Sequence, residues 1–320
     1  MTSRHEQRTA NIDRRRLLTM TGAALVMPAM AWQPARAQAR VVAETKVGSV
    51  GITIISDGTL ELPPSFVLPG RDQPQIEAAF KAAGGTFSGF KAEVNVAVIR
   101  AGSEVILVDT GAGPDFMPTL GKLAERLDSA GIKPEGVTKV VFTHAHADHL
   151  WGVIDPLGGE TLFEKAEHLI TTTERDFWIK DDVATSVPEA FRGMAAGTNR
   201  RLKTISAQLK TVAAGSEITS GVHVLDTAGH TPGHISLLVK SGSEQLLIGG
   251  DVLSQSVISF TEPGWRWGPD MDPEKAIVAR RRTLEQLAAE KIRLLGYHLP
   301  WPGLGRVERA GNAFRFVSEA

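Results

Sequence analysis

The chain contains no cysteine among its 320 residues. This absence excludes disulfide bonds, zinc sites with cysteine ligands and catalysis by a thiol group. Any metal site must therefore be built from the side chains of His, Asp and Glu. The sequence also lacks the G-x-S-x-G pattern that presents the nucleophile of many serine hydrolases, which disfavours that class of enzyme.

The first 39 residues contain no long apolar run, although their basic, apolar and small-residue segments follow one another in the order typical of an export signal. Three arginines, Arg14-Arg15-Arg16, precede Leu17-Leu18, and the apolar run over residues 20–32 is too short for a spanning helix. Small residues follow at 35–39, as at a signal cleavage site. We predict a removable signal of the twin-arginine type over residues 1–39. An uncleaved membrane anchor is the alternative.

An excess of positive charge is absent as well. The formal net charge of the whole chain is −1 at pH 7. Removal of residues 1–39, with six arginines and two acidic residues, leaves a mature chain at about −5. A basic footprint for nucleic acid is therefore not expected. The predicted partner is a small-molecule substrate, and the predicted location is periplasmic or secreted, with no stable membrane anchor.

The most informative feature that is present is an H-x-H-x-D-H cluster, formed by His144, His146, Asp148 and His149. It follows a short apolar run, residues 140–142, which is typical of a buried strand. Three imidazoles and a carboxylate buried at a strand end without hydrogen-bonding or metal partners would lower the stability of the fold by roughly several kcal/mol. These ligand types suit zinc or a similar metal, so the cluster predicts a metal site.

Three further strand ends carry the same kinds of side chain. His230 and His234 lie in a turn-rich G-H-T-P-G-H loop, Asp251 ends an apolar run, and His298 follows another. A single histidine after a strand is more often structural than a metal ligand. Because every one of these residues lies at a predicted strand end, we expect them to meet at one edge of the fold.

The hydrophobic pattern predicts two strand-rich halves that each end in helices, within one domain over residues 40–320. Alternation over residues 47–62 predicts a hairpin with its turn at Asp57-Gly58. Further strands are predicted at 94–99, 104–108, 139–143, 222–226, 235–239, 245–248 and 292–295. Helices are predicted at 74–83, 118–130, 173–180, 188–209 and 273–291.

Residues 63–90 break this regular pattern. They are rich in Pro and Gly and contain four phenylalanines, Phe66, Phe80, Phe87 and Phe90. The segment is predicted to form a lid over the site or a contact between subunits. The alternative is a surface loop whose phenylalanines fill the core.

Taken together, H-x-H-x-D-H, G-H-T-P-G-H, Gly250-Asp251 and the late His298 resemble the metallo-β-lactamase superfamily over essentially all of the mature chain. Ser56-Asp57-Gly58 and Asp109-Thr110-Gly111 are similar to its early motifs. The resemblance implies an α/β fold, the four-layer αββα sandwich, with a two-metal site at one edge of the paired sheets.

The resemblance also implies roles for individual residues. One of two divalent metal ions, expected to be Zn²⁺, would be held by His144, His146 and His230. The other would be held by Asp148, His149 and His298, with Asp251 as the bridge between them. His234 is not expected to be a ligand, and Asp57 and Asp109 are candidates to orient the ligating histidines.

Within the superfamily, the chain looks most like methyl parathion hydrolase and the lactonases and esterases related to it. The motifs that carry this likeness are Ser56-Asp57-Gly58-Thr59, Pro118-Thr119-Leu120-Gly121, Asp176-Phe177-Trp178, the run His298 to Gly305, and Phe314-Arg315-Phe316-Val317. The chain departs from the pattern at Trp151. Trp151, Trp178 and Phe191 are candidate walls of the substrate pocket, with plain core packing as the alternative, and a homodimer is expected.

The predicted function is hydrolysis of lactones, aryl esters or organophosphate triesters by a hydroxide held between two metals. Asp148 and Asp251 are the expected catalytic residues. A β-lactamase is disfavoured, because those enzymes lack a bridging carboxylate such as Asp251. An iron oxidoreductase similar to the single-iron sulfur dioxygenases is an alternative that stays open, since His146 is intact.

Overall fold

A computed structural model describes residues 41–155, 157 and 159–319. The predicted signal at residues 1–39 lies outside this range and stays a prediction. Residues Arg40–Ala320 group as one compact unit by their internal contacts. Among the described residues, no helix combines the length and the apolar character that crossing a membrane requires.

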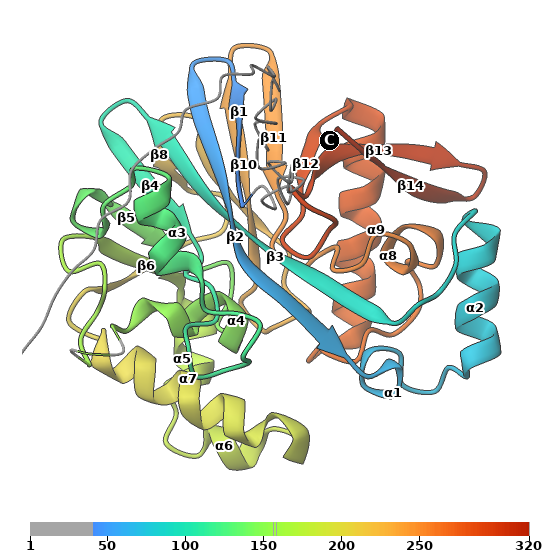
Figure 1. Cartoon of the computed structure of the whole chain (residues 1–320), viewed down its shortest axis with the longest axis horizontal. Coiled ribbons are helices and arrows are strands. Elements are labelled where there is room, and N and C mark those ends of the chain that lie inside the picture. Colours follow the sequence, from blue (N-terminus) through green and yellow to red (C-terminus); the bar gives the residue numbers. More distant parts are fainter. Residues whose placement is uncertain (1–40, 156, 158, 320) are drawn as a thin grey trace, which may run out of the picture. The chain divides into compact units, whose positions relative to one another are not determined.

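Two seven-stranded sheets form the centre of the fold (Figure 1). The first has the order β1-β2-β3-β4-β5-β6-β7 and the second β14-β13-β12-β11-β10-β9-β8. The strands of the first sheet are β1 (Val42–Val47), β2 (Val50–Leu62), β3 (Phe90–Ala101), β4 (Glu104–Val108), β5 (Lys139–Val141), β6 (Glu167–Thr171) and β7 (Leu209–Val212). Those of the second are β8 (Glu217–Thr219), β9 (Val222–Asp226), β10 (Ile235–Ser241), β11 (Glu244–Ile248), β12 (Arg293–Leu295), β13 (Leu304–Ala310) and β14 (Ala313–Ser318).

Parallel pairing among the described strands occurs in part of each sheet, and most of the functional loops follow these strands, whereas the loop with His230 joins the antiparallel strands β9 and β10. β4, β5, β6 and β7 pair in parallel, as do β11 and β12. Parallel neighbours end at the same edge of a sheet, so the loops that follow them are brought side by side. The described chain meets the expectation that the strand ends converge.

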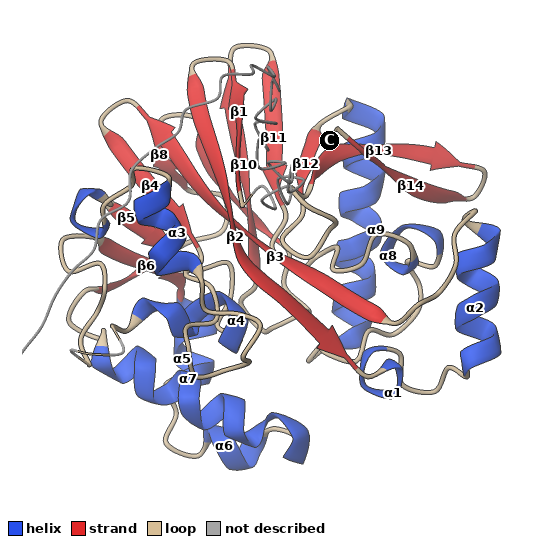
Figure 2. Ribbon diagram, viewed as in Figure 1, coloured by secondary structure: helices blue, strands red, loops and turns tan. Residues whose placement is uncertain are grey.

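Helices cover the outer faces of the sheets (Figure 2). Their bounds are α1 (Pro64–Val67), α2 (Gln73–Ala82), α3 (Leu123–Ser129), α4 (Ala147–Leu150), α5 (Thr172–Trp178), α6 (Val183–Ser186), α7 (Arg192–Thr204), α8 (Ile258–Thr261) and α9 (Pro273–Glu290). Asp72 and Asp272 cap α2 and α9 by accepting a backbone N–H in the first turn, and Pro stands in the first turn of both.

Three apolar layers hold the four structural layers together. One core lies between the two sheets and joins Ile52, Ile99 and Val141 to Leu237 and Ile248. A second packs the other face of the first sheet against α3 and α7, and a third packs the second sheet against α9. This arrangement is the predicted αββα sandwich, and the fold prediction is confirmed.

The predicted hairpin turn at Asp57-Gly58 is wrong. These residues form a bulge inside β2, which continues to Leu62, and the hairpin turn lies between β1 and β2 instead. The bulge turns the Asp57 carboxylate off the sheet, where it accepts backbone N–H groups from Ala112, Gly121 and Leu123. Because Asp57 holds residues 112–123 as a loop, α3 begins at Leu123 rather than at the predicted residue 118.

Residues 63–90 form α1, α2 and a satellite core. Phe80, Phe87 and Phe90 make edge-to-face contacts with one another, and Phe90 makes another with Trp267. Trp267 and Ile258 belong to the same buried cluster, so α2 packs beside α8. These phenylalanines therefore fill a satellite core, and the segment forms helices rather than a surface loop. Phe66 reaches the pocket described below, and the role of the segment as a lid or subunit contact stays a prediction.

Candidate metal centre

The H-x-H-x-D-H cluster lies where the sequence places it, directly after β5. Val140 and Val141 are fully buried in β5, and the chain then turns so that His146 becomes the residue before the short helix α4. Asp109, after β4, accepts hydrogen bonds from the backbone N–H and the hydroxyl of Thr143, each at 2.7 Å. This contact fixes the turn from which the cluster projects.

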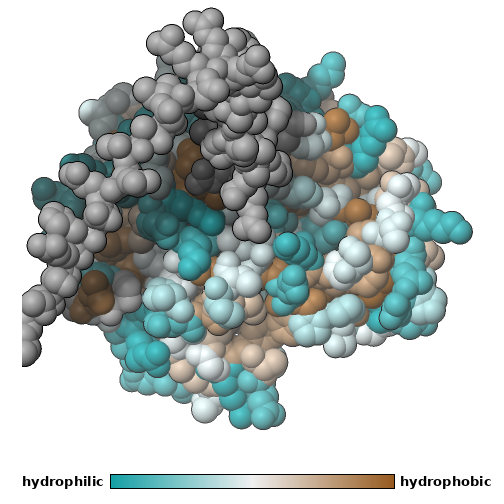
Figure 3. Space-filling model, viewed as in Figure 1, coloured by the Kyte–Doolittle hydropathy of each residue, from teal (hydrophilic) through white to brown (hydrophobic). Residues whose placement is uncertain are grey.

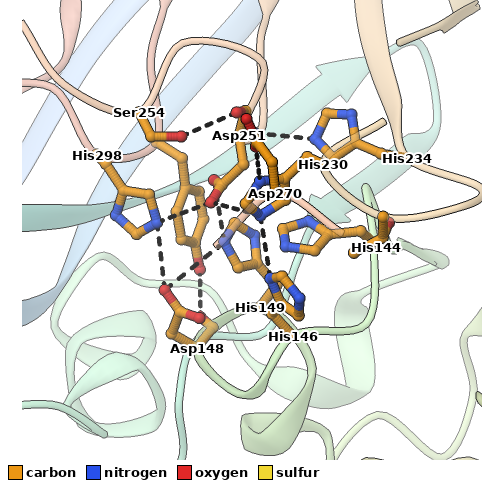
Figure 4. Close-up of polar contacts among 12 residues, drawn as sticks. His144, His146, Asp148, His149, His230, His234, Asp251, Ser254, Asp270 and His298 are labelled. Carbon is orange, nitrogen blue, oxygen red and sulfur yellow. Dashed lines mark hydrogen bonds and ion pairs between the residues drawn. The ribbon is translucent and has the colours of Figure 1, made fainter. Parts of the chain in front are cut away.

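The other predicted residues reach the same place from separate strand ends. His230 follows β9, Asp251 follows β11 and His298 follows β12. Figure 4 shows their side chains pointing toward those of the cluster. Donor atoms of three overlapping groups lie within 4.8 Å of one another: His144, His146 and His230; His144, His149 and Asp251; and Asp148, His149 and His298.

The distances between donor atoms match those expected around a metal ion. His146 Nδ1 and His230 Nε2 are 3.0 Å apart, and His230 Nε2 is 3.2 Å from Asp251 Oδ2. Two ligands on one tetrahedral zinc, each about 2.0–2.2 Å from it, are separated by roughly 3.3–3.5 Å. The first group of histidines and one oxygen of Asp251 therefore fit around one ion.

A second set has the same spacing. His298 Nε2 is 3.3 Å from Asp148 Oδ2, which is 3.7 Å from His149 Nε2. Asp251 also reaches this set, with Oδ1 3.2 Å from His149 Nε2 and Oδ2 3.3 Å from His298 Nε2. Asp251 lies between the two sets, as a bridging carboxylate would.

Several of these atoms are buried without a hydrogen-bond partner. They include His144 Nε2, and also His149 Nε2 and Asp251 Oδ1, which lie 3.2 Å apart without forming a hydrogen bond. A buried polar atom without a partner is costly, and native structures rarely leave one without a reason. Three such atoms on one cluster of potential ligands are explained by bound metal, so the residues fit divalent ions.

The charges of the cluster lead to the same conclusion. Although burial alone would lower the pKa of His149, carboxylates led by Asp251 raise it to about 10. In the same way the pKa of His230 is raised to about 9, against the effect of burial. Burial opposes ionisation of Asp148, yet His149 and His298 lower its pKa to about 2. The carboxylates thus demand neighbouring positive charge, which divalent cations supply in place of protons.

Each histidine of the second set is held by a further polar group. Asp109 Oδ2 lies 2.8 Å from His149 Nδ1, as predicted for Asp109. The carbonyl of Glu93 lies 2.8 Å from His298 Nδ1. The prediction that Asp57 would orient a histidine is wrong, because its carboxylate binds only backbone N–H groups of residues 112–123.

Three residues that support the cluster were missed by the sequence analysis. Asp270 accepts from His230, Glu174 binds the backbone beside two of the histidines, and the Tyr297 hydroxyl donates to the carbonyl of Asp148 at 2.7 Å. Tyr297 also stacks on His149, with ring centroids 3.9 Å apart. Its position directly before His298 was the signal in the sequence that could have identified it.

His234 supports the cluster without joining any of the groups of candidate ligands. Its Nε2 accepts the backbone N–H of Asp251 at 2.9 Å, and its Nδ1 lies 2.8 Å from the Thr227 hydroxyl. Burial lowers the pKa of His234 to about 3, so the ring is neutral and Nε2 is free to accept. This agrees with the expectation that His234 is not a ligand.

A pocket of about 350 Å³ opens onto the cluster. In the space-filling view, apolar side chains lie in the lower middle of the face shown, where the end of β2 and α7 lie in Figure 1 (Figure 3). Five polar residues line the pocket: His146, Asp148, Asp251, Ser254 and His298. The remaining lining residues are apolar: Leu60, Leu62, Pro63, Phe66, Ala92, Phe116, Met117, Ala190, Phe191, Met194, Trp267 and Pro269.

The three predicted wall residues take different positions. Phe191 lines the pocket, against the ring of Phe66. Trp178 is fully buried beneath His146 and lines a neighbouring cavity of about 480 Å³ instead. Trp151 lines neither cavity: its ring lies under the guanidinium of Arg201 and its indole N–H donates to Thr198. Trp151 is therefore a packing residue, which corrects its assignment to the pocket.

Comparisons with known proteins agree with this geometry. Residues 91–295 match the family model of the metallo-beta-lactamase superfamily. Metallo-beta-lactamase domain-containing protein 1 of Xenopus laevis is 29% identical over 213 residues, which are 66% of this chain and 73% of that protein. The solved structure of AidC, described as a dizinc quorum-quenching lactonase in complex with the product N-hexanoyl-L-homoserine, has a TM-score of 0.80 and 28% identity. The match covers 87% of this chain and 97% of that one. A hydrolase, AbOPH, described as in the beta lactamase superfamily, gives the same values.

Proposed function

The chain belongs to the metallo-β-lactamase superfamily. We propose that it hydrolyses neutral esters with the help of two divalent metal ions, for which zinc is the first candidate. The substrate class that we propose is lactones, aryl esters and organophosphate triesters. The family match, the solved lactonase and hydrolase structures and the cluster of His and Asp side chains support a metal-dependent hydrolase.

The observation that carries the substrate class is the composition of the pocket wall. Its polar side chains are those of the metal cluster and Ser254, and none of the residues that line it is Lys, Arg, Asn or Gln. Away from the metal positions, an anionic group of a substrate would lose its hydration against this apolar wall without gaining a cationic or amide partner. A neutral ester with apolar groups on both sides of the carbonyl or phosphoryl centre meets no such cost.

The residues of the cluster divide the work. His144, His146 and His230 would hold one ion, while His149, His298 and Asp148 would hold the other. Asp251 joins the two sets through its two oxygens. When bound there, two divalent ions would supply a hydroxide nucleophile from water at neutral pH and polarise the carbonyl or phosphoryl oxygen of the substrate.

We assign two tasks to the pocket itself. The apolar side chains around Phe66, Phe191 and Met194 bind the organic groups of the ester and exclude bulk water from the reacting centre. Asp148 lines the pocket, and its Oδ2 faces His149 and His298 as a candidate ligand. We assign its other carboxylate oxygen to accept a proton from the attacking water and return it to the leaving group.

A panel of substrates tests this proposal. We expect hydrolysis of an N-acyl homoserine lactone, an aryl acetate and a neutral aryl phosphotriester, compared by kcat/KM. A penicillin, which carries a carboxylate, and the phosphodiester matched to the triester serve as anionic controls. If either anionic compound is the best substrate, the assignment of a neutral ester is wrong.

Elemental analysis of the purified protein separates this proposal from the iron oxidoreductase alternative. We expect close to two equivalents of zinc or a similar divalent ion per chain. A single tightly held iron would favour the oxidoreductase and contradict the hydrolase.

We propose further that the protein is exported after cleavage near Ala39 or Arg40 and that it works as a homodimer. The arginine-containing segment before Leu17 supports export. Mass spectrometry of the protein recovered from the periplasm or the medium, and light scattering of the purified chain, would test these two points.

A further inference from the structure

A buried carboxylate outside the cluster connects two of the loops that carry the candidate ligands. Glu174 lies in the first turn of α5, and its side chain is fully buried. Four donors surround its two oxygens, at distances from 2.6 to 2.9 Å. Nothing in the proposed reaction uses this group.

The two oxygens of Glu174 serve different parts of the chain. Oε1 accepts the backbone N–H of Ala145 at 2.9 Å and the indole N–H of Trp178 at 2.6 Å. Oε2 accepts the hydroxyl of Thr231 and the backbone N–H of Gly233, both at 2.8 Å. One carboxylate thus connects the H-x-H-x-D-H loop to the G-H-T-P-G-H loop.

The bonded residues stand directly beside candidate ligands. Ala145 lies between His144 and His146, and Thr231 follows His230. These three histidines are the first of the groups that could hold a metal ion. Any change in the distance between the two loops would therefore move His230 relative to the other two.

The start of α5 also leaves no room for a side chain at residue 233, which is Gly233. A Cβ on this residue would lie 2.4 Å from the backbone nitrogen of Glu174 and 2.4 Å from the Thr171 hydroxyl. Thr171 donates to the Gly233 carbonyl at 2.8 Å and accepts the N–H of Glu174 as the cap of α5. The G-H-T-P-G-H loop is thus seated on the N-terminal end of α5 from two sides.

We propose that Glu174 is a positioning residue that sets the separation of His144 and His146 from His230, and with it the affinity of one metal position. The inference rests on the proposed metal site. His149 and His298 are held by Asp109 and the carbonyl of Glu93, so we expect the second metal position to depend less on Glu174 than the first.

The chemistry of the four contacts explains why a carboxylate stands here. An ionised carboxylate only accepts hydrogen bonds, and its two oxygens face four donors. A glutamine would keep one accepting oxygen and turn an NH₂ group toward two donors, so at least two of the four bonds would be lost. Buried donors left without an acceptor would push the two loops apart.

Zinc competition against a chromophoric chelator tests the proposal, with Glu174→Gln compared with the wild-type protein. We expect one of the two zinc equivalents to bind roughly 10–100-fold more weakly, as is common when a group that orients a ligand is changed. The affinity of the other equivalent should stay within about twofold of the wild type, because its anchors are intact.

Asp57→Asn is the matched control. Asp57 is also fully buried and also accepts several hydrogen bonds, but its donors, Ala112, Gly121 and Leu123, flank no candidate ligand. We expect this variant to lower the midpoint of thermal unfolding while both zinc affinities are retained. Loss of zinc in Asp57→Asn equal to that in Glu174→Gln would mean that any buried carboxylate has this effect, which would overturn a specific role.

Thr231→Val provides a milder variant for the case that Glu174→Gln does not fold. It removes one of the four donors and keeps the shape of the side chain, so a smaller loss of affinity at the same equivalent is expected. Folded variants with two wild-type zinc affinities would refute the inference about Glu174. A wild-type protein that binds fewer than two divalent ions would instead contradict the proposed function.

Discussion

Asp270 Oδ1 lies 2.9 Å from His230 Nδ1, deep in the second half of the chain. Both side chains are buried, and the other carboxylate oxygen accepts from Arg280 at 2.7 Å. An acceptor at Nδ1 places the hydrogen of a neutral imidazole on that nitrogen and leaves Nε2 free. Nε2 is the atom of His230 that faces Asp251 and His146.

The first prediction follows from this contact. Asp270→Asn should weaken binding of the zinc ion held by His230 by roughly 10–100-fold, because an amide is a poorer acceptor for the ring N–H. Chelator competition measures the affinity. The change also leaves Arg280 buried without its carboxylate, which should cost about 3–5 kcal/mol of unfolding free energy.

A double variant separates these two effects. In Asp270→Leu with Arg280→Met, the uncompensated charge is gone, and the unfolding free energy should recover toward that of the wild type. The zinc affinity should not recover, because His230 still lacks its acceptor. Recovery of both would show that Asp270 acts through stability alone.

The second prediction concerns the cluster itself. Dialysis of the purified protein against a strong chelator should abolish hydrolysis, and added zinc should restore it. His144→Ala and Asp251→Ala should each lose at least one metal equivalent and turnover, while circular dichroism shows the sandwich retained. Turnover in either variant near the wild-type level would mean that the reacting centre lies elsewhere.

The strand ends that carry most of the candidate ligands could be predicted from the sequence, because apolar runs such as residues 140–142 are followed within three residues by His or Asp. The four layers of the fold are predicted from the resemblance of the motifs to a known family. Asp270 could not be predicted in this way, since it lies 40 residues beyond His230 in the chain and no strand pattern precedes it. Its role depends on how α9 packs, which brings Arg280 against the same carboxylate.

The errors have physical reasons as well. Asp57-Gly58 has the composition of a tight turn, yet the carboxylate of Asp57 is bound by three backbone N–H groups from residues far along the chain. Trp151 follows the cluster closely, but Arg201 and Thr198 on α7 hold its ring away from the pocket. In both cases a partner that is distant in sequence decides the position.

The third prediction concerns Phe191, which lines both the pocket on the cluster and the cavity of about 480 Å³ beside it. Phe191→Ala should remove much of the partition between these spaces. We expect the ratio of kcat/KM for lactones with long acyl chains to that for lactones with short ones to rise. Each 1.4 kcal/mol of added apolar burial should raise this ratio roughly tenfold. Met194→Ala is the control, because Met194 lines the pocket but not the second cavity, so its truncation enlarges the pocket alone. An equal shift in both variants would argue against a partition at Phe191.

The fourth prediction concerns the dependence of stability on pH and rests on His168, a buried residue of β6 outside the groups of candidate ligands. Its ring stacks on Phe142, and Nε2 lies 3.2 Å from the Thr161 hydroxyl. Burial lowers its pKa from 6.5 to about 4. Between these values the unfolded chain binds a proton that the folded chain does not, so stability falls as the pH falls from about 6.5 toward 4.

The size of this effect can be measured by urea unfolding at pH 7 and pH 5. With the two pKa values above, His168 should account for about 2 kcal/mol of the stability lost between these conditions. In His168→Leu the loss should be smaller by this amount, even if the variant has a different stability at pH 7. If His168→Leu and the wild type lose the same free energy between pH 7 and pH 5, the ring of His168 does not titrate below its ordinary range.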